Sequence, residues 1–176
     1  MATISEQEEI VNLHDAHGKV APAHNRVIAI PVDASKFSEF AFNWAIKNLV
    51  RAETDQIVLL NVRPAATVPK FFAATGTDVS TELDRIQSAY KQQSHELLQS
   101  YAAKLAPNKY NIRGVALVGD PREQITLKVE EIHADMLVIG SRGLGAFQKV
   151  VLGSVSEYLI QHLNIPVIVP RSNELK

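Results

Sequence analysis

Short apolar runs rich in β-branched residues alternate with segments of helical periodicity along most of the chain, and this alternation constrains the fold most strongly. Between the runs, apolar residues recur every three or four positions, as on the buried face of a helix. The runs show no polar–apolar alternation, which is typical of strands covered on both faces in a parallel sheet. The pattern therefore predicts an α/β domain with a doubly wound parallel sheet. Its five predicted strands are Val27–Val32, Ile57–Val62, Val115–Val118, Met136–Ile139 and Val167–Val169.

Prolines predict where several of these elements end. Pro166 and Pro170 flank the last strand, and proline lacks the N–H that a central strand uses for pairing, so we expect this strand at an edge of the sheet. Pro121 is expected to begin the third helix, where the missing N–H costs nothing. Pro107 and Asn108 are expected to end the long second helix.

Composition and charge exclude several classes of function. The chain has 176 residues, a formal net charge of −1 and no cysteine. The lack of cysteine excludes disulfide frameworks, thiolate zinc sites and cysteine nucleophiles. A nearly neutral chain gives no electrostatic case for nucleic-acid binding, and no apolar run approaches the roughly 18 to 20 residues that span a bilayer. We therefore expect a cytoplasmic protein with neither nucleic acid nor membrane as a partner.

Residues 1–24 differ from the domain that we assign to residues 25–176. They carry four acidic side chains against Lys19 alone, and they lack the basic and apolar regions of a signal peptide. Ile10 and Val11 are compatible with one side of a short helix, but sparse apolar residues favour a mobile or loosely docked extension. Its three histidines have no partners at ligand spacing, so no metal site is expected.

Glycines gather at one place in the predicted fold. Four of the eight glycines fall between the fourth strand and the last helix, namely Gly140, Gly143, Gly145 and Gly153. The carboxyl ends of the strands form the ligand crevice of such folds. Glycine allows positive φ and lets backbone N–H groups approach a phosphate, and a helix N-terminus favours an anion. Taken together the glycines predict a phosphate site, although each alone is equally compatible with a turn.

Two polar residues near this crevice are open to a structural interpretation as well. Ser154 and Glu157 have the spacing of a capping box, so the Ser154 hydroxyl either caps the last helix or contacts a ligand. Asp33 follows the first strand and either faces a ligand or helps to begin a helix beside Ser35.

Other phosphate-binding and catalytic motifs do not fit. Gly140 and Gly145 have the spacing of a Walker A loop, but Ala146 and Phe147 replace its lysine and hydroxyl residue. The first strand–helix turn contains no glycine, which argues against a dinucleotide fingerprint, and G-x-S-x-G is absent from the sequence.

The motif Gly140-x2-Gly143-x9-Gly153-Ser154 resembles the ATP-binding signature of the universal stress protein family. The likeness covers about Arg26 to Arg171 and is supported by Asp33-x-Ser35, by Gly119-Asp120-Pro121 and by the last strand. The resemblance implies a five-stranded sheet in the order 3-2-1-4-5, with helices on both faces. It brings Asp33 and Gly140 together although 107 residues separate them.

The resemblance also implies a site and a partner. Backbone at Pro31, Val32 and Val62 would hold adenine, Mg²⁺ would sit on the ATP phosphates, and no protein metal site or catalytic residue is implied. Family members commonly form homodimers through the last strand, here Val167, Ile168 and Val169. The implied nucleotide-binding residues are Pro31, Val32, Asp33, Val62, Ile139, Gly140, Arg142, Gly143, Gly153, Ser154 and Val155.

Three functions remain open from the sequence. The first is an ATP-binding regulatory protein of the stress response, with occupancy coupled to the dimer, a partner or the Arg63–Ser80 loop. The second is a slow ATP-hydrolysing enzyme that uses Asp33 and Arg142, because phosphoryl transfer needs a base, a cation and a metal site that the sequence otherwise lacks. The third is a dimeric interaction module that binds no nucleotide.

Overall fold

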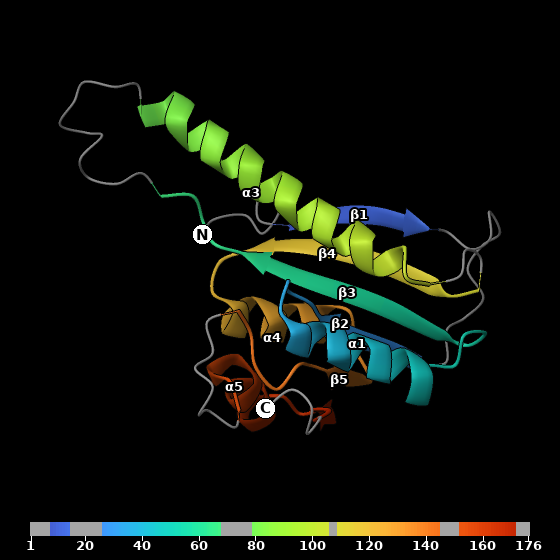
Figure 1. Ribbon diagram of the computed structural model, residues 1–176. Coiled ribbons are helices and arrows are strands. Elements are labelled where there is room, and N and C mark those ends of the chain that lie inside the picture. The colour runs from blue at the N-terminus through green and yellow to red at the C-terminus, as the bar shows by residue number, and fades with distance from the viewer. Residues whose placement is uncertain (1–7, 15–25, 68–78, 106–108, 145–151, 172–176) are drawn as a thin grey trace.

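The computed structural model describes residues 8–14, 26–67, 79–105, 109–144 and 152–171, which build one sheet with helices on both faces (Figure 1). The five predicted strands are present and pair in parallel in the order β4-β3-β2-β5-β6, which confirms the predicted class and order. β4 begins four residues before the predicted start. The prediction missed these residues because they mix polar with apolar side chains. The strands are β2 (Arg26–Pro31), β3 (Asp55–Arg63), β4 (Asn111–Val118), β5 (Met136–Val138) and β6 (Val167–Ile168).

A sixth strand, β1 (Glu8–His14), pairs antiparallel with β4 and forms one edge of the sheet. The predicted count of five strands was too low, because residues 8–14 of the N-terminal extension form this additional strand. Val11 is 7% exposed and joins the core, while Ile10 is 55% exposed, as the two faces of an edge strand require. An antiparallel edge strand on an otherwise parallel sheet is common. Residues 1–7 and 15–25 lie outside the described part of the chain.

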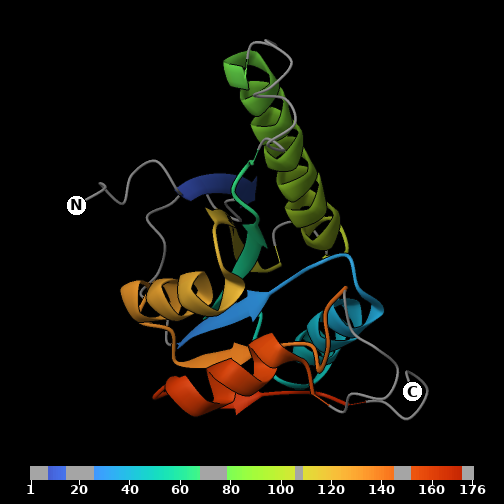
Figure 2. The same ribbon diagram turned by 90° about the vertical axis from the view of Figure 1, so that its left-hand side faces the viewer.

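The helices divide the core into two layers, one on each face of the sheet (Figure 2). α1 (Lys36–Asn48) and α3 (Val79–Ala102) cover one face, and α4 (Pro121–Glu131) and α5 (Ser154–His162) cover the other. Ile28 and Ile30 pack toward α1 and α3, whereas Ala29 packs toward α4 and α5. All three are fully buried, which explains why the strands read as continuous apolar runs.

Side-chain caps fix the starts of two helices. The Ser35 hydroxyl accepts a hydrogen bond from the Ser38 N–H at the start of α1. Asp120 caps α4 in the same way, and Pro121 occupies its first position as predicted. β6 lies at the sheet edge, as its flanking prolines predict.

α3 is the longest described helix, and its buried residues lie in its second half. Its buried residues all lie from Ser94 onward, and its first half extends past the ends of the strands in Figure 1. Glu9 of β1 pairs with this helix through Lys91 Nζ at 3.0 Å and His95 Nε2 at 3.1 Å. No described helix is both long and apolar enough to cross a membrane. α3 ends at Ala102, and the predicted stop at Pro107 and Asn108 falls on undescribed residues.

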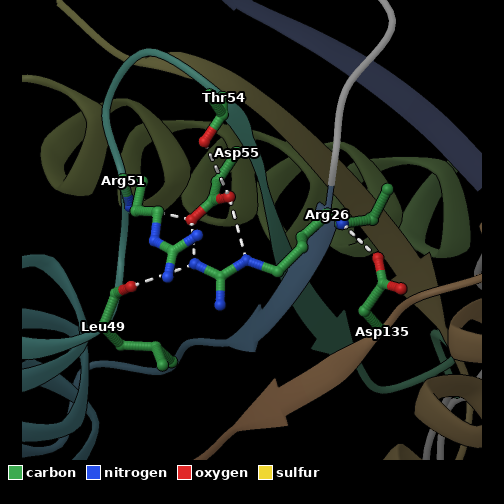
Figure 3. A network of polar contacts seen from close by, with 7 residues as sticks. Arg26, Leu49, Arg51, Thr54, Asp55 and Asp135 are labelled. Carbon is green, nitrogen blue, oxygen red and sulfur yellow. Dashed lines mark hydrogen bonds and ion pairs between the residues drawn. The ribbon is translucent and has the colours of Figure 1, made fainter.

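A buried carboxylate joins the amino ends of β2 and β3 (Figure 3). Asp55 accepts hydrogen bonds from Arg26 Nε at 3.0 Å, Arg26 Nη2 at 2.6 Å and the Arg51 N–H at 2.7 Å. Burial alone would raise the pKa of Asp55, but these donors and the Arg26 charge lower it below the ordinary value. The side chains of Arg26 and Asp55 therefore hold the two strands in register at the end opposite the glycines.

A candidate ligand-binding cavity at the strand carboxyl ends

A cavity of about 570 Å³ lies at the carboxyl ends of β2, β3 and β5, beside the start of α5. Its volume falls in the range of roughly 300 to 1,000 Å³ that small-molecule sites occupy. It also lies at the switch point of the sheet, because β2 pairs with β3 on one side and with β5 on the other. All eleven residues of the predicted nucleotide site line it. Those residues are Pro31, Val32, Asp33, Val62, Ile139, Gly140, Arg142, Gly143, Gly153, Ser154 and Val155.

Sequence reasoning missed several further lining residues. Leu60 and Ile125 extend the apolar wall, and their sequence pattern does not distinguish them from core positions. Asn61 is a polar residue within the apolar run of β3, and this mismatch is a signal that could have identified it. Leu144 is strongly exposed in the loop beyond Gly143. The described lining residues that sequence reasoning missed are Ser38, Leu60, Asn61, Ile125, Leu144 and Ser156, whereas Pro121 belongs to the Gly119-Asp120-Pro121 turn that the sequence singled out.

Asp33 supports the start of α1 and also lines the cavity. Its Oδ1 accepts a hydrogen bond from the Ser35 N–H at 2.9 Å, so the carboxylate supports the start of α1. The same residue lines the cavity. A Cβ added to Gly143 would lie 2.9 Å from Asp33 Oδ2, which shows how closely the glycine loop approaches this carboxylate. Asp33 is therefore both a turn residue and a wall of the cavity.

Close packing, rather than positive φ, explains the glycines of the motif. A Cβ on Gly140 would lie 2.9 Å from backbone atoms of Phe37 and Ser38, where α1 crosses the end of β5. Gly153 has φ −74°, and its N–H donates to the Ser141 carbonyl at 2.7 Å. Among the described residues, positive φ occurs at a different glycine, Gly119 after β4, with φ 134°. The glycines thus let the loop, α1 and α5 meet around the cavity.

The start of α5 corrects one prediction. Gly153 is the N-cap and Ser154 is the first helical residue, so the capping box of Ser154 and Glu157 is not formed. The Ser154 side chain is exposed and lines the cavity, and its hydroxyl has no hydrogen-bond partner among the described residues. Instead Ser156 is the structural serine, because its buried Oγ donates to the Gly140 carbonyl at 2.8 Å. The first N–H groups of α5 are free of intrahelical bonds at the cavity wall.

Arg142 supplies a cation at the same end of the cavity. Its guanidinium lies over the Phe37 ring, 4.9 Å from the ring centre, which is the geometry of a cation–π contact. Its Nε is buried and has no hydrogen-bond partner within the described residues. The described chain contains no cluster of three or more His, Cys, Asp or Glu that would hold a metal ion. Gly145 lies outside the described residues, so its predicted turn role is untested.

Comparisons with known proteins agree with this geometry. The profile of the Universal stress protein family matches residues 24–171. The chain is 29% identical to the Universal stress protein A-like protein of Arabidopsis thaliana, over 83% of this chain and 90% of the relative. It is 34% identical to Universal stress protein PHOS32 of the same organism, over 83% of this chain and 64% of the relative.

Solved structures share the fold at lower sequence identity. The hypothetical protein MJ0577 superposes with a TM-score of 0.70 at 23% identity, covering 84% of this chain and 97% of the other. A universal stress protein family member from Arabidopsis thaliana with AMP bound superposes with a TM-score of 0.59, covering 85% and 94%. A universal stress protein in complex with cAMP gives 0.56, covering 85% and 98%. The family profile spans nearly all of the described domain, and the chain therefore belongs to the universal stress protein family.

Proposed function

We propose that this chain is a nucleotide-binding regulatory protein that holds ATP with Mg²⁺ in the cavity described above. The observation that carries the proposal is that the lining of this one cavity is divided between apolar side chains and a polar set made of the glycine loop, the start of α5 and Arg142. Such a division suits a ligand with a flat apolar base at one end and phosphates at the other. The adenine-nucleotide complexes AMP and cAMP of two structural neighbours support the choice of base.

The apolar end matches the requirements of adenine. Val32 and Val62 lie at the ends of adjacent strands, and Ile125 approaches from α4. Aliphatic side chains on both sides would remove the faces of a purine ring from water, at roughly 25 cal/mol for each Å² of apolar surface buried. Backbone at Pro31, Val32 and Val62 would then recognise the edge of the base, as the family resemblance implies.

The opposite end matches the requirements of phosphate. The first turn of α5 brings free N–H groups and the positive end of a helix dipole to the cavity, and the Ser154 hydroxyl adds a donor. Arg142 adds a positive charge, and its Nε has no hydrogen-bond partner in the part of the chain that the structure describes. Backbone at Gly140 and Gly143 can approach an anion without a Cβ between them.

The same residues give little support for rapid catalysis. Mg²⁺ would be held mainly by the phosphates, with Asp33 as the carboxylate of the cavity wall. Rapid phosphoryl transfer needs a positioned base and firm metal ligands, so we propose a binding role in which any hydrolysis is slow. A homodimer through β6 completes the proposal. Val167 to Val169 lie at the edge of the described sheet, and pairing with a second copy would cover the outer side of this edge strand.

The nucleotide content of the purified protein tests this function directly. Protein prepared without added nucleotide should release adenine nucleotide on denaturation, identified by mass spectrometry, or should bind Mg·ATP in calorimetry after the carried-over ligand is removed. Turnover near 1 s⁻¹, within the ordinary enzyme range, that is lost in Asp33→Asn would support the enzyme instead. Failure to bind Mg·ATP or AMP at millimolar concentration would support the interaction module.

Two serines of α5 provide a matched test of the phosphate end. Ser154→Ala should leave the free energy of unfolding within about 0.5 kcal/mol of the wild type, because the described chain gives this hydroxyl no partner. It should weaken Mg·ATP binding about tenfold, since a hydrogen bond to a charged group contributes roughly 1.5 kcal/mol.

Ser156→Ala should have the opposite profile to Ser154→Ala. It leaves the buried Gly140 carbonyl without its donor, at a cost of about 1 to 3 kcal/mol in unfolding free energy. Urea unfolding gives the stabilities and calorimetry gives the affinities. Equal affinities for Ser154→Ala and the wild type would remove Ser154 from the phosphate site.

A further inference from the structure

The backbone N–H and C=O of Asp33 are both held by buried side chains, one from each of two helices. The Tyr101 hydroxyl of α3 donates to the Asp33 carbonyl at 2.9 Å, and the Asp33 N–H donates to Ser38 Oγ of α1 at 3.0 Å. Tyr101 and Ser38 lie 3.3 Å apart through their oxygens. Because a carbonyl only accepts, the Tyr101 proton points to Asp33, and the Ser38 proton points to Tyr101. Ser38, Tyr101 and the backbone of Asp33 therefore close a ring of hydrogen bonds.

The carbonyl of the preceding residue, Val32, is held by a second buried route from the same helix. Asn61 Nδ2 donates to the Val32 carbonyl at 2.8 Å, and Ser94 Oγ of α3 lies 2.6 Å from Asn61 Oδ1. The Val32 carbonyl requires a donor, so it fixes the orientation of the Asn61 amide, and Ser94 must then donate to Oδ1. Asn61 and Ser94 are both buried, and Asn61 also lines the cavity.

Both routes begin on one face of α3. Ser94 and Tyr101 lie seven residues apart on this helix, which is two turns and places them one above the other. The Tyr101 ring also packs edge-on against Phe42, with ring centres 5.0 Å apart, so the hydroxyl has a fixed position. Burial raises the pKa of Tyr101 above its ordinary value, so the phenol remains a donor at neutral pH. α3 is thus attached to two successive residues of the cavity wall, Val32 and Asp33, at the carboxyl end of β2.

We propose that Tyr101 and Ser94 are positioning residues for nucleotide binding, and that α3 holds the turn after β2 in its binding geometry through them. This inference rests on the proposed function. A turn that is already ordered loses less conformational freedom when a ligand binds, so affinity depends on the two attachments although neither residue is required to contact the ligand. α3, which also pairs with β1 through Glu9, becomes the element that responds to occupancy of the cavity.

Four single variants of α3 test the proposal with matched controls. Tyr101→Phe and Ser94→Ala each remove one hydroxyl, and Tyr90→Phe and Ser100→Ala make the same chemical changes on the same helix away from the cavity. Ser100 Oγ donates only to the Leu97 carbonyl at an exposed position. Calorimetry with Mg·ATP, at a temperature where every variant is folded, should show Kd raised about tenfold for the first pair and by less than about twofold for the controls.

Amide hydrogen exchange separates positioning from a general loss of stability. Without ligand, the Ser35 and Asp33 amides should exchange faster in Tyr101→Phe than in the wild type, while core amides of β3 such as Leu59 remain protected. Saturating Mg·ATP should restore protection of the turn. Unchanged Kd in both variants, or exchange that rises equally throughout the sheet, overturns the inference. A wild-type protein that binds neither Mg·ATP nor AMP overturns the proposed function, and the inference with it.

Discussion

Gly140→Ala should lower the free energy of unfolding by about 3 kcal/mol and abolish detectable nucleotide binding. The added Cβ would lie 2.9 Å from the Phe37 carbonyl carbon and oxygen and from the Ser38 nitrogen. These are backbone atoms of the first turn of α1, so relief requires β5 and α1 to separate, and such overpacking costs typically 1 to 3 kcal/mol or more. The same movement would displace Ser38, whose Oγ accepts a hydrogen bond from the Asp33 N–H. Urea unfolding and calorimetry measure the two effects.

Gly143→Ala is the control for this prediction. Its Cβ would meet Asp33 Oδ2 at 2.9 Å, which is the end of a side chain rather than backbone. A rotation of the carboxylate relieves that contact, so we expect a stability change below about 1 kcal/mol with weaker nucleotide binding. If Gly140→Ala were as stable as Gly143→Ala, the close approach of α1 and β5 would not be the reason for glycine at position 140.

The second large effect is expected at the other end of the sheet. Asp55→Asn should lower the free energy of unfolding by about 3 kcal/mol, near the lower limit for breaking a buried ion pair, because Arg26 retains some contact with water. Asp55 is 2% exposed, and its carboxylate accepts from Arg26 and from the Arg51 N–H (Figure 3). Glu53→Gln, an exposed change two residues away, should alter stability by less than about 0.5 kcal/mol.

The pH dependence of stability identifies the charge as the cause. The folded state lowers the pKa of Asp55, so this carboxylate stabilises the fold at pH values above its unfolded pKa, near 4. That contribution is lost as the pH falls through the lowered folded value. The stability difference between wild type and Asp55→Asn should therefore be constant near neutral pH and shrink below about pH 4. A difference that persists at acid pH would indicate a packing effect instead.

The parallel part of the fold and the place of the cavity could be predicted because their signals are local. Each buried strand is a continuous apolar run, and Ile28, Ala29 and Ile30 illustrate why both faces must be apolar. The glycine motif follows one of these strands directly. The residues that line the cavity then follow from the strand order, which places the ends of β2 and β5 side by side.

The features that could not be predicted depend on contacts between residues that are distant in the sequence. Among the side chains of β1 whose burial is described, Val11 alone is buried, and the pairing partner β4 lies about a hundred residues away. Asn61 stands out as polar within an apolar run, but nothing local identifies Ser94 as its partner. At α5, a cap at Gly153 rather than Ser154 is a shift of one residue, and a sequence pattern does not resolve helix ends that finely.

The wide sequence separation of the paired strands has a consequence for synthesis of the chain. β1 leaves the ribosome well before its partner β4, which is complete only once Val118 has emerged. The cavity can form only after α5 has followed, because residues of α5 line it. Until then the nascent chain presents unpaired strand edges, which favour aggregation, and such distant pairings form slowly. A ligand that binds between β2 and α5 can therefore bind only after α5 has folded. It would then stabilise the folded state against unfolding by mass action.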